Sequence, residues 1–100
     1  MVKDLSASQF QALVGSRFSL TPSGGAPFEA ELADVTLLEA HEGPRPQPFS
    51  AVFIDPRKSV VLPQQIFQVE SPAVGSVELF LVPIGPDPKG LGMRYEAVFN

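Results

Sequence analysis

Short runs of alternating apolar and polar residues, separated by turns rich in Pro and Gly, extend from Arg17 to the end of the chain. A period of two places successive side chains on opposite faces of a strand, so these runs predict β-strands. Six or seven such runs at regular spacing are typical of a small sandwich or barrel. The sequence therefore predicts an all-β, mainly antiparallel fold of six or seven strands, as a barrel or a sandwich.

Details of the pattern predict how individual strands behave. The apolar phase of the strand that begins at Phe28 slips after Leu32, which predicts a β-bulge. The run 48–54 is apolar on both faces in its second half, as expected of a central strand. Val60–Leu62 is expected to form a short or edge strand, because Pro63 cannot donate to a ladder.

The closing part of the chain is the best specified. Runs 66–70 and 77–82 flank residues 71–75, which are expected to form a five-residue hairpin loop. Strands at 79–82 and 93–99 are expected to belong to the core. The eight Phe residues, with one Tyr and no Trp, are expected to serve chiefly as core filler. Tyr95 is expected to be a core ring whose hydroxyl reaches a backbone partner.

One short helix is expected near the N-terminus. Ser6 and Gln9 have the spacing of a capping box, and Leu5 and Phe10 that of a hydrophobic staple. Phe10, Leu13 and Val14 share one helical face, and Gly15 supplies the stop. Because two turns of helix are unstable alone, this helix is expected to lie as a lid or plug on the β-structure.

Length and composition narrow the class of protein. One hundred residues are expected to form a single domain, 1–100. The net charge of −4 and the scattered positions of the seven basic residues argue against nucleic-acid binding. No stretch approaches the ~18 apolar residues that span a membrane. The lack of Cys and of an N-terminal signal-like run favours a cytoplasmic protein.

No pattern of catalytic, cofactor-binding or metal-ligating residues emerges. His41 is the one histidine and stands in a Gly/Pro loop, where we expect a solvated side chain. Glu29 and Glu31 are expected on the solvent face of one strand rather than in a cation site. The Gly-rich segment 85–92 lacks phosphate-loop spacing. We therefore expect a protein that is not an enzyme.

Two loops are the best candidates for contact with a partner, because loops on a rigid sheet commonly carry binding residues. One is the Pro-rich segment 41–48, and the other joins the last two strands. The candidate contact residues are Arg45, Gln47, Pro86, Asp87 and Lys89.

The segments Val61–Gln64, Glu78–Pro86 and Met93–Asn100 resemble a family of bacterial proteins of about 100 residues and unknown function. Its members tend to share a helix ending in LVG, a PFS strand and an ending close to MRYEAVFN. The resemblance implies no catalytic residues. It implies an association with phage-tail-like genes, notably those of tail-collar-type proteins, and hence a small accessory or assembly factor.

Two functions follow as expectations. The first is a non-enzymatic interaction or structural module with a protein partner, which leaves homo-oligomerisation open. The alternative is a small-molecule-binding barrel, suggested by the Phe-rich interior and the helical plug. A hydrolase that uses His41 is a third hypothesis.

Overall fold

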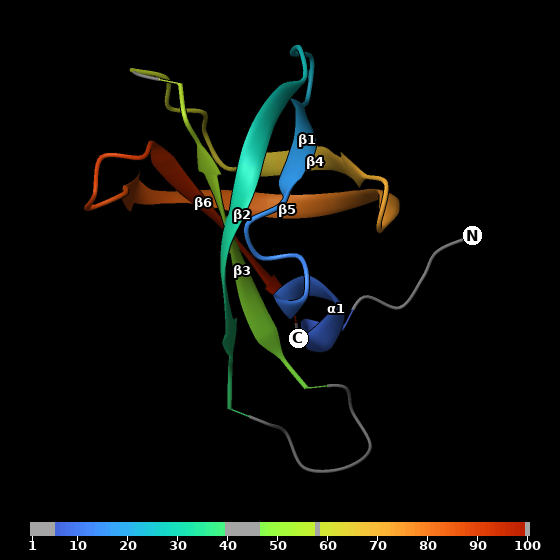
Figure 1. Ribbon diagram of the computed structural model, residues 1–100. Coiled ribbons are helices and arrows are strands. Elements are labelled where there is room, and N and C mark those ends of the chain that lie inside the picture. Colours follow the sequence, from blue (N-terminus) through green and yellow to red (C-terminus); the bar gives the residue numbers. More distant parts are fainter. Residues whose placement is uncertain (1–5, 40–46, 58, 100) are drawn as a thin grey trace.

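The computed structural model describes residues 6–39, 47–57 and 59–99. One helix and six antiparallel strands make up this part of the chain (Figure 1). They are α1 (Ala7–Gln11), β1 (Arg17–Pro22), β2 (Phe28–Leu37), β3 (Phe49–Asp55), β4 (Gln65–Ser71), β5 (Gly75–Pro86) and β6 (Met93–Phe99). The strands form a closed barrel in the order β1-β2-β3-β6-β5-β4. The all-β prediction is confirmed, and the barrel is the correct alternative.

Closure depends on β1, which pairs with β2 on one side and with β4 on the other. Leu20, for example, lies opposite Phe28 of β2 and Val69 of β4. The predicted bulge is present in β2, where the register with β3 shifts between Leu32 and Asp34. A bulge bends its strand and increases its twist, which helps the sheet to close.

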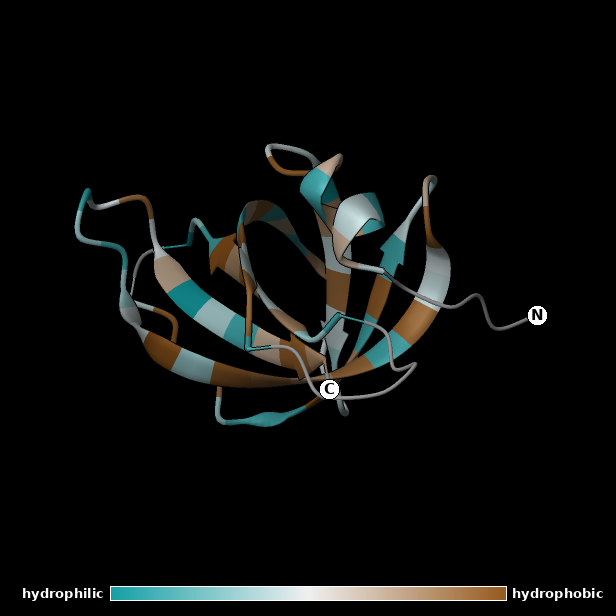
Figure 2. Cartoon of the chain, turned by 90° about the horizontal axis from the view of Figure 1, so that it is seen from below, coloured by the Kyte–Doolittle hydropathy of each residue, from teal (hydrophilic) through white to brown (hydrophobic). Residues whose placement is uncertain are grey.

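Helix α1 covers one end of the barrel, as predicted. Its capping box is complete: the Gln9 N–H donates to Ser6 Oγ at 3.3 Å, and the Ser6 N–H donates to Gln9 Oε1 at 3.0 Å. Phe10 is fully buried, with ring centroids 5.3 Å from Phe99 and 5.6 Å from Phe49. Figure 2 shows α1 over the concave side of the curved strands.

The helix ends earlier than the apolar pattern predicts. It stops at Gln11, and Val14 is exposed, so the expected third member of the buried face lies outside it. Gly15 has a φ of +94°, which fits its predicted role at the end of this turn. The expected staple residue Leu5 lies outside the described residues.

The barrel interior is filled with side chains. Rings meet from several strands, including Phe18 with Phe53 at 5.3 Å between centroids and Phe67 with Tyr95 at 6.1 Å. The fully buried residues include Phe10, Phe18, Leu20, Leu32, Phe53, Phe67, Val69, Leu81 and Tyr95. The prediction that Phe side chains serve chiefly as core filler is confirmed for most of the eight Phe residues. Strand β3 is buried on both faces except at Val52, as predicted for a central strand.

Two local predictions are wrong. Val60–Leu62 forms no strand, because the Leu62 N–H donates to the Tyr95 hydroxyl at 2.8 Å instead of to a ladder. The expected five-residue loop 71–75 is shorter, because Ser71 and Gly75 face each other as the last pair of the β4–β5 ladder. Only Pro72, Ala73 and Val74 remain in the turn, and β5 extends to Pro86.

Candidate interaction surface

A buried carboxylate marks the end of the barrel opposite α1. Asp55, at the end of β3, is fully buried, and Arg57 donates to it through Nε at 3.0 Å and through one terminal nitrogen at 2.8 Å. The same guanidinium lies 4.0 Å from the centre of the Phe28 ring. The hydrogen bond with Asp55 is the main reason why the pKa of Arg57 is raised. The pair therefore fixes the chain at this end of the barrel.

Two further contacts hold the covering segments in place. The Tyr95 hydroxyl accepts from the Leu62 N–H, which confirms the predicted backbone partner and fastens segment 59–64 to the core. Gly92 lies directly against the backbone of Asp55 and Pro56, so that a Cβ there would overlap the Asp55 carbonyl. The loop between β5 and β6 thus packs on the end of β3.

Three of the predicted contact residues lie in this loop or at the end of β5 that leads into it. Pro86 pairs with Met93 at the end of the ladder, and the Asp87 carboxylate accepts from the N–H groups of Lys89 (2.9 Å) and Leu91 (3.4 Å). Asp87 therefore folds the loop on itself. Pro86 and Asp87 also line a shallow groove of about 340 Å³ together with residues of the 56–61 segment and Met93.

Of the other predicted contact residues, Gln47 lies at the opposite end of β3. Gln47 precedes β3, and its side-chain amide donates to the carbonyl of Leu38 at 2.6 Å, which ties together the two arms of the β2–β3 connection. Arg45 and His41 lie outside the described residues. Gln47 lies before the first residue of β3, whereas Asp87 belongs to the loop at the Asp55 end of β3, so the structure does not bring the two together on one surface.

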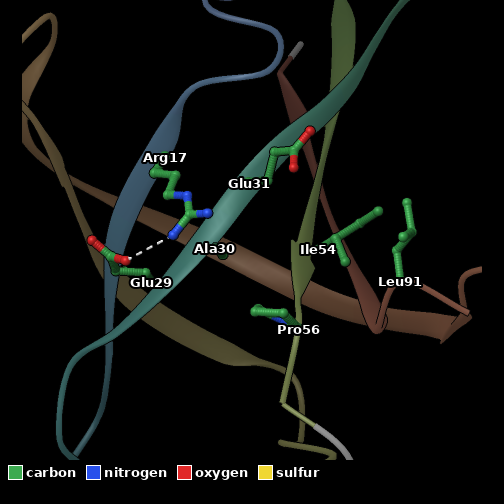
Figure 3. Close-up of a pocket in the computed structure, with 7 residues that line it drawn as sticks. All are labelled: Arg17, Glu29, Ala30, Glu31, Ile54, Pro56 and Leu91. Carbon is green, nitrogen blue, oxygen red and sulfur yellow. Dashed lines mark hydrogen bonds and ion pairs between the residues drawn. The ribbon is translucent and has the colours of Figure 1, made fainter.

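Glu29 and Glu31 point to the same outer face of β2, as expected from the alternation. Arg17 of β1 approaches Glu29 at 3.3 Å, and both side chains are largely exposed (Figure 3). Together with Ile54, Pro56 and Leu91 these residues line a pocket of about 140 Å³. That volume is below the ~300 Å³ at which small-molecule sites begin.

Within the described ranges, no three Asp, Glu or His side chains gather in a way that could hold a metal ion. The helix that the structure describes is too short to cross a membrane.

The strongest surface feature is an apolar row on the outside of β4, β5 and β6. Ile66 lies opposite Phe80, and Phe80 and Val98 line one groove of about 360 Å³ between β5 and β6. Their exposed fractions are 55% for Ile66, 52% for Phe80 and 52% for Val98. Large contiguous apolar patches on the surface of a monomer often mark interaction sites, which makes this row the candidate surface.

The strands of the closing hairpin, which were expected to belong to the core, contribute to the core on one face and to this row on the other. Leu81 and Tyr95 do point inward, but Phe80 and Val98 point outward. The sequence contains a sign of this exposure. In the continuous apolar run 79–82, every second side chain points away from the core if only one face of the strand is buried.

The fold and this surface define a small β-barrel with a helix over one end and an apolar row on the outer face of β4, β5 and β6. Comparison with family models identifies the chain as a member of a family described as Domain of unknown function (DUF6916), with residues 5–99 matched. Neither the curated proteins nor the solved structures gave a match to the chain.

Proposed function

We propose that this protein is a non-enzymatic interaction module that binds a protein partner through the outer face of β4, β5 and β6. The observation that carries the proposal is the row Ile66, Phe80 and Val98 on a barrel whose inside is already filled. Burial of ~100 Å² of apolar surface contributes about 2.5 kcal/mol, so covering this row provides a substantial part of a binding energy.

The packed interior supports this module over the alternative of a small-molecule-binding barrel. Phe49 and Phe99 stack at 4.3 Å between ring centroids, and Phe10 lies against both rings. A ligand inside the barrel would have to displace these rings. Partner contact on the outside requires no such rearrangement.

For the biological setting, we propose that the module is an accessory or assembly factor of a phage-tail-like particle and acts in the cytoplasm. The resemblance of segments 78–86 and 93–100 to proteins that accompany tail-collar-type genes supports this setting. The absence of Cys supports the compartment. The proposed partner is a tail-collar-type protein.

Co-purification tests both parts of the proposal. The chain is produced together with a tail-collar-type protein from the same genome, and the mixture is analysed by size-exclusion chromatography. We expect co-elution for the wild type, and loss of co-elution for Phe80→Ser. Leu91→Ser is the matched control, because Leu91 is similarly exposed but lies in another part of the surface.

Separate elution of the two wild-type proteins would contradict the phage-tail setting. Equal retention of the partner by Phe80→Ser and by wild type would contradict the assignment of the surface. Circular dichroism of each variant confirms that it is folded.

A further inference from the structure

Strand β5 has an unpaired edge. It pairs with β4 along its first part, from Ser71↔Gly75 to Gln65↔Leu81, but its ladder with β6 begins only at Val82↔Glu96. Beyond that point β6 follows β3, with Val98 opposite Ser50, while β5 continues alongside β4. In Figure 1 the two strands separate on the side toward α1. Among the described residues, Gly75–Leu81 therefore has a partner strand on one side only.

This edge lacks three features that usually protect a free strand, namely Pro, Lys and a bulge, and it carries one charged residue, Glu78. Natural edge strands carry Pro, Lys, a bulge or a covering segment, because their free N–H and C=O groups would otherwise pair with another chain. Gly75–Leu81 reads GSVELFL, with no Pro and no Lys. Its ladder with β4 is regular, without a register shift. The edge is thus an intact template for one further strand.

The groove beside the edge offers apolar contacts on its walls and floor. Phe80 and Val98 stand exposed along it, and the partly buried Leu79 and Phe99 lie beneath. An added strand places every second side chain on the same face of the sheet. Alternate apolar side chains of such a strand would therefore meet Phe80 and Val98.

The charge of the groove selects between occupants. Glu78 and Glu96 line it, and among the residues that the structure describes no Lys or Arg does. Arg94, on the same face of β6 as Glu96, directs its guanidinium to the carbonyls of Ile84 and Gly85 at 3.4 Å. The groove is therefore negative, and a basic partner is complementary to it.

A second copy of the chain fits this charge poorly. Pairing of two β5 edges would bring a second Glu78 and Glu96 to the groove, between molecules that each carry a net charge of −4. Like charges facing each other across a ladder destabilise it. A heterologous strand with Lys or Arg avoids this repulsion.

We propose that the β5 edge, Gly75–Leu81, binds an extended segment of a protein partner in which a Lys or Arg and an apolar residue stand two positions apart, so that both lie on the face of the sheet that carries Glu78 and Phe80. The segment adds a strand to the barrel: backbone hydrogen bonds supply affinity, and the alternate side chains supply selectivity. This proposal deepens the proposed function and rests on it.

Selection from a display library of random twelve-residue peptides on the full chain tests the chemistry. We expect enriched peptides to carry a basic and an apolar residue two positions apart, to bind Phe80→Ser at least tenfold more weakly, and to bind Leu91→Ser within twofold of wild type. Glu78→Lys is expected to weaken them at least fivefold. Enrichment of acidic peptides, or equal binding to Phe80→Ser, would overturn the proposal.

Amide hydrogen exchange of the full chain with the best peptide tests the pairing. We expect the exchange of alternate amides within 75–81 to slow at least tenfold, and peptides N-methylated at alternate positions to lose this protection. Unchanged exchange in this segment would overturn the proposal. A concentration-dependent dimer with protected β5 amides would also overturn it, in favour of a second copy.

The two proposals fail separately. If Phe80→Ser no longer binds the collar-type protein, but no peptide protects the β5 amides of the wild type, the proposed function stands and the proposed edge pairing is wrong. If peptides bind at the β5 edge, but Phe80→Ser still binds the collar-type protein, only the proposed function is wrong.

Discussion

Arg57 closes over the carboxylate of Asp55, two residues earlier in the chain, with three hydrogen bonds from its side chain and one from its backbone N–H. Asp55 is fully buried, so Arg57 supplies the charge and the donors that a buried carboxylate requires. Because the pKa of Arg57 is raised in the folded protein, the stabilisation that Arg57 provides is fully present at any pH below the pKa of Arg57 in the unfolded chain. That contribution is lost only as the pH rises through the higher folded-state value.

Arg57→Ala is expected to lower the free energy of unfolding by about 2 kcal/mol, because it leaves the Asp55 charge buried and without its counter-ion. The cost is below the ~3–5 kcal/mol of a fully buried pair, because the Arg57 side chain is partly exposed. Urea unfolding at neutral pH measures it. In an Asp55→Asn background the same change should cost less than about 1 kcal/mol. Equal costs in the two backgrounds would show that the pair is not the source of the stability.

Tyr95→Phe is expected to destabilise the fold by about 1 kcal/mol, since it removes the acceptor of the Leu62 N–H without changing the ring. The effect should be concentrated in segment 59–64. Hydrogen exchange of the Leu62 amide is expected to accelerate, whereas exchange of the Ala51 amide in β3 should follow global stability alone. Unaltered exchange at Leu62 would argue against this contact.

Gly92→Ala is expected to be more harmful than Gly90→Ala, although both glycines belong to the same loop. Gly90 has a φ of +77° with open space around it, so an added methyl group costs about 1–2 kcal/mol of backbone strain. Gly92 has a φ of +136° and would also press its Cβ into the Asp55 backbone. Thermal unfolding should therefore show the larger loss of Tm for Gly92→Ala. The reverse order would contradict the packing of this loop on β3.

The effects of Phe10→Ala and Phe80→Ala on stability are expected to differ, because the Phe10 ring is buried under α1 and the Phe80 ring is exposed. Phe10→Ala is expected to cost about 3–5 kcal/mol, because it opens a cavity among Phe18, Phe49 and Phe99. Phe80→Ala should change stability by less than about 1 kcal/mol, because half of that ring is already in water. Denaturant midpoints measure both, and a large loss for Phe80→Ala would mean that Phe80 belongs to the core.

Much of the fold was predictable because it depends on local patterns. The capping box at Ser6, the bulge after Leu32 and the bounds of β6 each follow from side-chain chemistry or from alternation within a few residues. Val60–Leu62 was predicted wrongly for a non-local reason. Its β-forming composition was overridden by a hydrogen bond to Tyr95, 33 positions away in the chain.

The candidate surface was less predictable, because it depends on which strands meet. Gln47 and Asp87 belong to two loops of similar composition, yet the order of the strands places them at opposite ends of β3. Alternation alone does not show whether a continuous run such as 79–82 is covered on both faces. The exposure of Phe80 became evident only with the barrel assembled.

The sequence by itself determined the class of fold, the short capped helix and the bulge, because these follow from local periodicity and from the spacing of neighbouring side chains. Only the tertiary structure decided that the sheet closes into a barrel, that Arg57 neutralises Asp55, and that β5 separates from β6 at Val82. These relationships arise from contacts between distant parts of the chain. Their geometry is set by strand order, twist and register, which no single run of residues contains.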